Sequence, residues 1–409
     1  MISDPIDLAA TTAGIAESAH PLYGQVVAID AAVNRVSVSS LAARLPQPGY
    51  DQSLRDGFAL AVGGWETEDG LRFSVVGEAP AGSARKIVLA EGTACRIMTG
   101  AMVPEGVERV VPFEDCVVDG DAVTVSRKAM GRRQTFIEAA GSQIAAGVVI
   151  VEAGTILQPE HLTALAATGH SEIEVCHKPR VGFFCTGSEL VDTAEELQPG
   201  LKVSGNRYLL DGLIRQFLAE AEDLGRVADR REDLARLFEK IAVGNFDAVI
   251  STGGMGPGKY DLLEEAFVAA GGEVVFRTLP MRPGQSTLIG QLGGKPFFGL
   301  PGPPGAVRTL MNEVVGPALL QMQGVKEFEP VVVRGRLRER VELKRSDVLL
   351  VKGGMLRVTG DGMEVRLAGK LEPPSCFVLF PPGREVYLSG SQVEAHLAWS
   401  PEVARLFRG

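Results

Sequence analysis

Glycine, proline and polar side chains gather in four short loops between residues 186 and 305, and each loop adjoins an apolar run. In the longest of them, residues 252–261, closely spaced glycines would let backbone N–H groups approach a phosphate or another oxyanion. A helix that begins near Asp261 would add the favourable partial charge of its N-terminus, and Asp261 could cap that helix or ligate a divalent cation. The candidate phosphate-binding residues of this loop are Gly253, Gly254, Gly256 and Gly258. A tight turn between a strand and a helix would use the same residue types, so this alternative stays open for the loop taken alone.

The other three loops supply charged and polar groups. Glu189, in TGSEL, could be a ligand or a hydrogen-bond acceptor, or could simply favour the dipole of a following helix. Arg282, in MRPGQS, could bind a phosphate through two parallel hydrogen bonds, although a lone arginine is more often a surface residue. The remaining candidate binding residues of these loops are Gly284, Gln285, Pro301 and Gly302. Because all four loops should meet at one edge of a sheet, together they predict an anion pocket.

The element pattern of residues 179–325 explains why the loops should meet. Short apolar runs that end in glycine or proline alternate there with amphipathic stretches, of which residues 206–225 are the first. In that stretch one helical face carries Leu209, Leu213, Ile214 and Phe217. Such repetition is typical of a parallel sheet covered by helices on both faces, with its ligand site beyond the carboxyl ends of the strands.

Three further units are predicted around this central three-layer α/β domain, to which residues 1–20 are also assigned. Closely spaced strand-like runs with glycine turns, including LRFSVV, ARKIVLA and CRIMTG, indicate a β-rich insert over residues 42–140. The flanking segments 21–41 and 141–178 are expected to pair with each other as a hinge or linker domain. Residues 326–409 return to β texture and predict a small C-terminal β-barrel. The predicted fold class is thus multidomain α/β plus β.

Composition excludes several other classes. The chain has 409 residues and a net charge of −10, which argues against nonspecific binding to nucleic acid or to an anionic membrane surface. Its five cysteines include no C-x-x-C pair, and its five histidines show no metal-ligand spacing. No signal peptide, apolar span, P-loop, G-x-S-x-G elbow or H-E-x-x-H helix is visible. A cytoplasmic protein is expected.

Long motifs in both halves of the chain resemble the MoeA family. SLRDGFA (53–59) is similar to the family's S-x-M-D-G-Y-A, and RIMTGAMVPEGVERVVPFED (96–115) matches a longer family motif. The α/β region contains TGSEL, PGLKVSGN, STGGMGPGKYD, MRPGQS and GLPGPP in the family's order. The match runs over nearly the whole chain, which is therefore identified as a member of this family by resemblance.

The resemblance implies an elongated four-domain homodimer whose active site lies in a cleft between subunits, with an α/β domain of the molybdopterin-binding type facing the insert of the partner. The implied reaction inserts molybdate into adenylylated molybdopterin with Mg²⁺ and releases AMP. A molybdopterin adenylyltransferase would be a partner, and the motifs do not distinguish molybdate from tungstate. Carried over by position, the catalytic residues are Asp56, Thr99, Glu189 and Asp261, with Glu189 and Asp261 as metal ligands and Asn206 as a cofactor-binding residue.

Several motif positions depart from the family pattern. The usual T-G-D-E-L has Ser188 in place of its aspartate, and Gln285 replaces a lysine of P-G-K-P. The other departures are Ser142-Gln143, Ser204-Gly205, Lys259 and Pro303. They leave a second hypothesis beside the enzyme: a catalytically weakened paralogue that binds molybdopterin or its nucleotide as a carrier or sensor.

Overall fold

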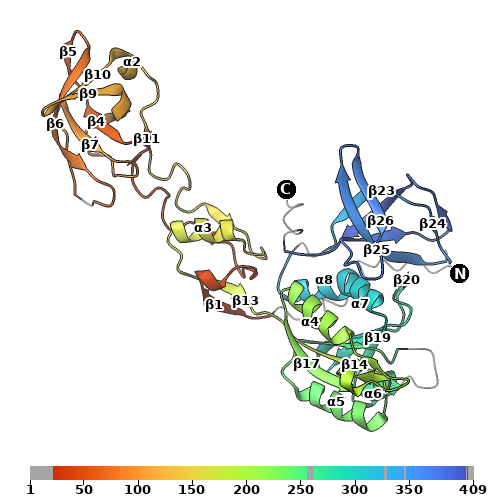
Figure 1. Ribbon diagram of the computed structural model, residues 1–409. Coiled ribbons are helices and arrows are strands. Elements are labelled where there is room, and N and C mark those ends of the chain that lie inside the picture. The colour runs from red at the N-terminus through yellow and green to blue at the C-terminus, as the bar shows by residue number, and fades with distance from the viewer. Residues whose placement is uncertain are drawn as a thin grey trace.

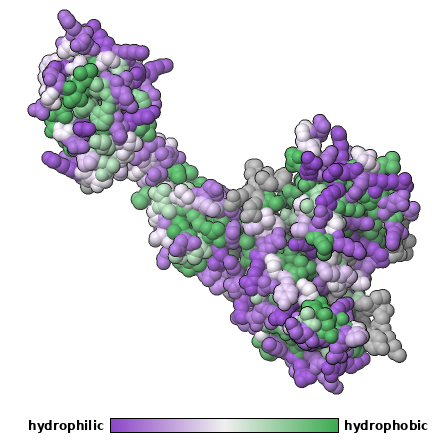
Figure 2. All heavy atoms as spheres, viewed as in Figure 1, coloured by the Kyte–Doolittle hydropathy of each residue, from purple (hydrophilic) through white to green (hydrophobic). Residues whose placement is uncertain are grey.

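The computed structural model describes residues 22–83, 85–255, 262–326, 329–344, 347–401 and 403. The molecule is elongated: a β-rich unit lies at one end and a narrow linker joins it to an α/β unit and a β-barrel at the other end (Figure 1). On the face drawn in Figure 2, hydrophilic and hydrophobic residues are intermingled along the whole length. The extended shape places the insert far from the α/β unit of the same chain.

The β-rich unit is built on a seven-stranded sheet of order β8-β4-β7-β6-β10-β9, with β5 paired to β6. Its elements are β3 (Gln52–Ser53), β4 (Gly57–Ala61), β5 (Trp65–Thr67), β6 (Gly70–Ala79), β7 (Thr93–Ile97), β8 (Val107–Pro112), β9 (Cys116–Asp119), β10 (Ala122–Val125), α2 (Arg127–Met130) and β11 (Ile137–Glu138). The predicted strand ARKIVLA is not formed. Within its described residues only Val88 makes an isolated bridge, to Glu105.

The linker is made by two chain segments that enclose the insert. Its elements are β1 (Gly24–Ala28), β2 (Leu41–Ala42), β12 (Val149–Val151), α3 (Pro159–Ala167) and β13 (Glu172–Cys176). The strand β1 pairs with β13, and β2 pairs with β12, so each pair joins the chain before the insert to the chain after it. Residues 1–20, which the sequence assigns to the α/β domain, lie outside the described residues.

The α/β unit has a six-stranded sheet of order β17-β14-β18-β22-β21-β19. Its strands are β14 (Arg180–Thr186), β17 (Glu220–Val227), β18 (Ala248–Thr252), β19 (Glu273–Phe276), β21 (Leu288–Leu292) and β22 (Lys295–Leu300), with the short β15 (Leu190–Val191) and β16 (Lys202–Val203) beside them. Its helices are α4 (Asn206–Gln216), α5 (Arg231–Val243), α6 (Leu262–Ala269), α7 (Pro304–Leu310) and α8 (Gly316–Met322), and a π-helical turn (Met311–Val315) joins the last two.

The sheet is mixed rather than wholly parallel. The strands β17, β14, β18 and β22 are parallel, whereas β21 is antiparallel to both of its neighbours. Gly293 and Gly294, both with positive φ, form the two-residue connection between β21 and β22. Two consecutive glycines are typical of a tight hairpin turn, so the sequence QLGGKP indicates a β-hairpin.

A second difference concerns the amphipathic stretch 206–225, because its helix ends at Gln216 and its last part belongs to the edge strand β17. Leu218 has a φ of 62°, a left-handed conformation that a helix cannot continue through. The strand sequence EAEDLGRV has few apolar residues, which is why its pattern did not predict a strand.

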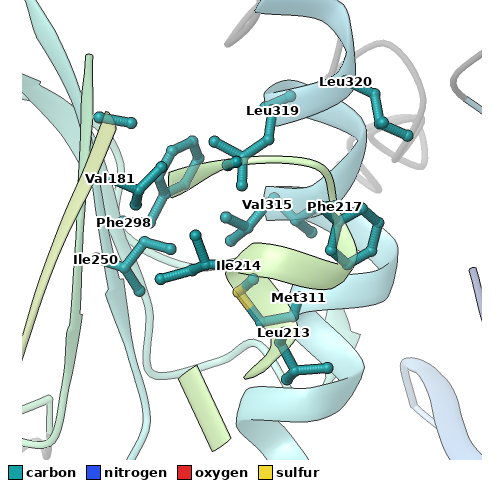
Figure 3. Packing of buried hydrophobic residues seen from close by; sticks show 14 of the residues in the cluster. Val181, Leu213, Ile214, Phe217, Ile250, Phe298, Met311, Val315, Leu319 and Leu320 are labelled. Carbon is teal, nitrogen blue, oxygen red and sulfur yellow. The ribbon is translucent and has the colours of Figure 1, made fainter. Parts of the chain in front are cut away.

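Two hydrophobic cores lie on opposite faces of the sheet, as expected for three layers. On one face α4, α7, the π-helical turn and α8 cover Val181, Ile250 and Phe298, which Figure 3 shows packed against Ile214 and Val315. On the other face α5 and α6 cover a cluster of their own. The predicted apolar face of α4 is thus confirmed.

The C-terminal unit is a closed five-stranded barrel, in which β25, β26, β23, β29 and β27 pair in a ring. Its strands are β23 (Val332–Leu337), β24 (Val341–Glu342), β25 (Leu349–Thr359), β26 (Gly362–Leu367), β27 (Cys376–Phe380), β28 (Val386–Tyr387) and β29 (Gln392–Leu397). The short strand β20 (Met281–Arg282) of the α/β unit pairs with β25, so the loop that contains Arg282 is attached to the barrel.

Candidate functional site

A cavity of about 690 Å³ opens at the carboxyl ends of the parallel strands, and we call it the strand-end cavity. The segments that follow β14, β17, β18 and β22 all line it, which places three of the four predicted loops together. Its lining includes the predicted binding residues Glu189, Asn206, Gly253, Gly254, Pro301 and Gly302. The expectation that these loops meet at one edge agrees with this geometry.

Asn206, the first residue of α4, ties two of the loops together. Its side-chain Nδ2 donates hydrogen bonds to the carbonyl oxygen of Gly302 at 2.7 Å and to Thr252 Oγ1 at 3.3 Å. Because a carbonyl oxygen can only accept, this contact fixes the orientation of the amide. The N-terminus of α4 therefore lies at the wall of the cavity, where its partial positive charge favours a phosphate.

Two carboxylates also line the strand-end cavity. Glu189 Oε1 lies 2.9 Å from Lys202 Nζ, and this ammonium group holds the pKa of Glu189 below its usual range. Asp229 follows β17 and accepts a hydrogen bond from the backbone N–H of Ser188 at 3.2 Å. Although Ser188 replaces the aspartate of the family motif, a carboxylate thus lies beside it, because Asp229 follows the neighbouring strand β17.

Gly253 shows why the loop after β18 requires glycine. It has a φ of 94°, and a Cβ atom there would lie 2.2 Å from the carbonyl oxygen of Thr186. Gly254 has a φ of 65°, so both residues adopt the left-handed conformation that glycine favours.

The substitution Gly253→Ala should therefore destabilise the protein. We expect a loss of about 2 kcal/mol or more in the free energy of unfolding, from left-handed strain and from displacement of the β14 end. Denaturant unfolding checks this, with Gly302→Ala as the matched control, since a Cβ at Gly302 would meet no atom within 4 Å. Equal stability of the two variants would show that the close approach at Gly253 is not required.

The fourth predicted loop does not enter the cavity as a whole. Ser286 lines the strand-end cavity, but Arg282, Gly284 and Gln285 are absent from its lining. Arg282 Nε donates a hydrogen bond to Gln285 Oε1 at 2.6 Å, so these two predicted ligands bind each other. The pairing of β20 with β25 explains the difference, because it turns the start of this loop toward the barrel.

A second cavity, of about 820 Å³, lies between α7 and the barrel, and we call it the interdomain cavity. Three cationic side chains line it: Arg308 of α7, Lys352 of β25 and Lys370 of the loop after β26. Among the described residues Arg308 has no hydrogen-bond or ion-pair partner, and burial lowers its pKa. Pro304 lines both cavities, which are therefore neighbours.

The acidic side chain of the interdomain cavity is already neutralised. Glu372 accepts two hydrogen bonds from Arg366, at 2.6 and 2.7 Å, which together with the Gly369 N–H lower the pKa of Glu372 to about 2. The charge left for a ligand is positive, and an unpartnered, partly buried guanidinium is suited to a tetrahedral oxyanion. Arg308 was missed by sequence reasoning because a single arginine within a helix carries no motif.

Asp56 and Thr99 contact each other in the β-rich unit, which lies at the opposite end of the molecule from the α/β unit and the barrel that line the two cavities (Figure 1). Asp56 Oδ1 accepts hydrogen bonds from the Thr99 backbone N–H at 2.7 Å and from its hydroxyl at 2.8 Å. These two hydrogen bonds hold the pKa of Asp56 below its usual range, and the one from the backbone N–H has the larger effect. Two motifs 43 residues apart thus form one exposed, negatively charged corner.

Removing the hydroxyl in Thr99→Val should raise the pKa of Asp56 part of the way toward its ordinary value, since the backbone bond remains. NMR titration of the Asp56 carboxyl in both proteins checks this. An unchanged pKa would mean that the hydroxyl contributes nothing to holding the carboxylate charged.

Some predicted site residues cannot be placed. Gly256, Gly258 and Asp261 lie outside the described residues. In the part of the chain that is described, no group of three or more His, Cys, Asp or Glu side chains could hold a metal ion. Asp229 was missed because the strand before it had been assigned to a helix; a correct strand assignment would have placed it at a strand end.

Comparison with known proteins agrees with this architecture. A family model described as the MoeA N-terminal region, domains I and II, matches residues 6–169, and one described as a probable molybdopterin binding domain matches residues 182–321. Proteins named molybdopterin molybdenumtransferase are similar over 91% of this chain: that of Staphylococcus aureus is 29% identical, with 91% of its length covered, and that of Staphylococcus epidermidis is 28% identical, with 90% covered.

Among solved structures, a molybdopterin biosynthesis MoeA protein from Pyrococcus horikoshii aligns with a TM-score of 0.80 and 26% identity. The alignment covers 97% of this chain and all of that one. Fold and site thus define a multidomain protein with an α/β domain of the molybdopterin-binding type. The chain belongs to the MoeA family. Within its described residues no helix is long and apolar enough to cross a membrane.

Proposed function

We propose that this protein is an enzyme of molybdenum cofactor biosynthesis that inserts molybdate into adenylylated molybdopterin and releases AMP. The observation that carries the proposal is the pair of neighbouring cavities, one at a helix N-terminus among glycines and one lined by cations that have no ion-pair partner among the described residues. The names of the S. aureus and S. epidermidis relatives support the same chemistry. A nucleotide and an oxyanion each require one such cavity.

The strand-end cavity would hold the phosphate groups of the nucleotide. The N-terminus of α4 and the Gly254 backbone supply N–H groups and partial positive charge there, whereas the Gly253 N–H already donates to the Leu300 carbonyl oxygen at 3.0 Å. Mg²⁺ would neutralise charge on the departing phosphate when bound. The residues present fit it, because Glu189 and Asp229 line the cavity and Mg²⁺ commonly uses one or two carboxylates together with substrate phosphates.

The interdomain cavity would hold molybdate beside that nucleotide. Arg308, Lys352 and Lys370 would bind and orient the dianion, and Pro304 forms the boundary across which the two ligands meet. Gln285 contributes no charge but keeps Arg282 in place through their hydrogen bond. The positive charge of the interdomain cavity thus comes from α7 and the barrel. It does not depend on the motif position at which Gln285 replaces a lysine.

A homodimer would complete the site. The β-rich unit that carries the Asp56–Thr99 corner lies at the other end of the molecule from the units that line both cavities, so the insert of a second copy would bring the corner to them (Figure 1). Closed two-fold dimers are the commonest soluble oligomers. A molybdopterin adenylyltransferase is the class of partner that must supply the adenylylated substrate.

Binding of AMP with and without Mg²⁺ tests the location of the nucleotide. Asp229→Asn keeps an acceptor for Ser188 but loses the charge, so the Mg²⁺-dependent part of the AMP affinity should fall roughly 10-fold. Asp211→Asn, which removes an equally charged group paired with Arg215 on α4, should leave it unchanged. Equal Mg²⁺ dependence in wild type and Asp229→Asn would remove Asp229 from the site. AMP binding without turnover of the adenylylated substrate would instead favour the carrier or sensor hypothesis.

A further inference from the structure

We propose that Glu313 and His396 act as a pair of positioning residues that sets the width of the interdomain cavity and thereby its affinity for a tetrahedral oxyanion. The inference rests on the proposed function, since it assigns a supporting pair to the anion part of that site. Glu313 belongs to the π-helical turn between α7 and α8, and His396 belongs to β29 of the barrel. Each unit that borders the cavity contributes one member of the pair.

The pair is buried and tightly bonded. The side chain of Glu313 is 0% exposed and that of His396 is 15% exposed, and His396 Nδ1 lies 2.6 Å from Glu313 Oε2. The other carboxylate oxygen accepts a hydrogen bond from Asn312 Nδ2 at 3.1 Å. A carboxyl group removed from water requires hydrogen-bonding partners, so Glu313 favours the arrangement in which His396 is docked.

Neighbouring contacts direct this docking to one corner of the barrel. Asn312 Oδ1 accepts a hydrogen bond from the backbone N–H of Trp399 at 2.9 Å. The ring of Trp399 stacks on Phe217 at 4.8 Å between centroids, and its carbonyl oxygen accepts a hydrogen bond from Gln216. The chain just after β29 is therefore fixed to α4 and to the π-helical turn.

A direct row of residues connects the pair to the cavity. In the barrel His396 is opposite Phe377 of β27, and Phe377 is opposite Gly353 of β25. Phe377 and Gly353 both line the cavity, beside Lys352. Since neighbouring strands lie about 4.8 Å apart, the row spans about 10 Å from His396 to Gly353.

The other wall is connected as closely. Thr309 and Arg308 line the cavity from α7, and Thr309 precedes Glu313 by four residues, about one helical turn. A change in the distance between Glu313 and His396 would therefore move Lys352 relative to Arg308. None of the barrel residues that the structure describes lines the strand-end cavity, so the nucleotide should not sense this change.

Isothermal titration of molybdate and of AMP into the full-length protein tests the proposal. Glu313→Gln and His396→Gln keep hydrogen-bonding groups of similar size but replace the carboxyl and the imidazole that form the contact. We expect each to weaken molybdate binding roughly 10-fold, the double variant to lose no more than either single one, and AMP affinity to change less than about twofold. The matched control is Glu394→Gln. Glu394 lies on β29, as His396 does, but forms an exposed ion pair with Arg334 of β23, so this variant should bind molybdate as the wild type does.

The outcomes separate this proposal from the proposed function. Unchanged molybdate affinity in both single variants overturns the positioning role while the enzyme stands, and equal losses of molybdate and AMP affinity show a merely structural role and overturn it too. If Glu313→Gln fails to fold, the molybdate affinity of His396→Gln tests the proposal alone, because the side chain of His396 is less buried than that of Glu313. If the wild-type protein binds AMP but no molybdate, the interdomain cavity is not an anion site, and the proposed role of the pair is overturned with it. Failure to bind either ligand contradicts the proposed function itself.

Discussion

Replacing Arg308 with alanine is expected to lower the affinity for molybdate roughly 10- to 100-fold, because a hydrogen bond to a charged group contributes about 1.5–3 kcal/mol. Arg308 lines the interdomain cavity, and no described residue satisfies its guanidinium. Burial lowers its pKa, which means that the charged form is disfavoured there until an anion is bound. The free energy of unfolding should accordingly stay the same or rise in Arg308→Ala.

The control for this variant is Arg215→Ala, which removes the same charge from an exposed pair with Asp211 on α4. Titration of molybdate into both proteins, with thermal unfolding of each, separates ligand binding from folding. Wild-type molybdate affinity in Arg308→Ala would exclude this side chain from the anion site. A parallel loss of affinity and of stability would show that Arg308 supports α7 rather than a ligand.

The second large effect is expected from complementation between subunits. Asp56→Ala removes the insert corner and Asp229→Ala removes a carboxylate of the strand-end cavity, and each alone should lower turnover roughly 100-fold, as expected when a group that positions the reactants or Mg²⁺ is lost. If each active site combines two chains, a mixed dimer of these variants contains one intact site. Random assembly of both chains should then restore about one quarter of wild-type turnover, because half of the dimers are mixed and each has one intact site of two.

Co-expression of the two variants, followed by isolation of the dimers and an assay of AMP release, checks this expectation. The control is co-expression of Asp56→Ala with a second Asp56 variant, Asp56→Asn, which should restore nothing. A mixture no more active than its parents would contradict a site shared between copies.

Much of the fold could be predicted because its patterns are local. The alternation of apolar runs and amphipathic stretches predicted the three layers, and the buried positions of Leu213, Ile214 and Phe217 agree with it. The edge strand β17 could not be read in this way, because an edge strand buries little and its sequence is polar. The antiparallel strand β21 was not predicted, although Gly293-Gly294 is typical of the hairpin turn that joins it to β22.

The candidate site was predictable where it depends on loops at strand ends and not where it depends on packing between units. Glu189, Asn206 and Gly253 line one cavity because the parallel strands end at one edge. Asp229 and Arg308 carry no motif, and their roles follow only from the position of β17 and from the contact of α7 with the barrel. The pairing of β20 with β25, which sets Arg282 apart from the strand-end cavity, joins segments 68 residues apart in the register Met281↔Leu349, and no local pattern indicates it.

Single-turnover release of AMP from adenylylated molybdopterin, with Mg²⁺ and with or without molybdate, tests the central claim most directly. We predict release that depends on molybdate and that is slowed in Arg308→Ala and in Asp229→Asn, but not in Arg215→Ala or Asp211→Asn. Release at the same rate without molybdate, or tight binding of the nucleotide with no release at all, would contradict the insertion reaction.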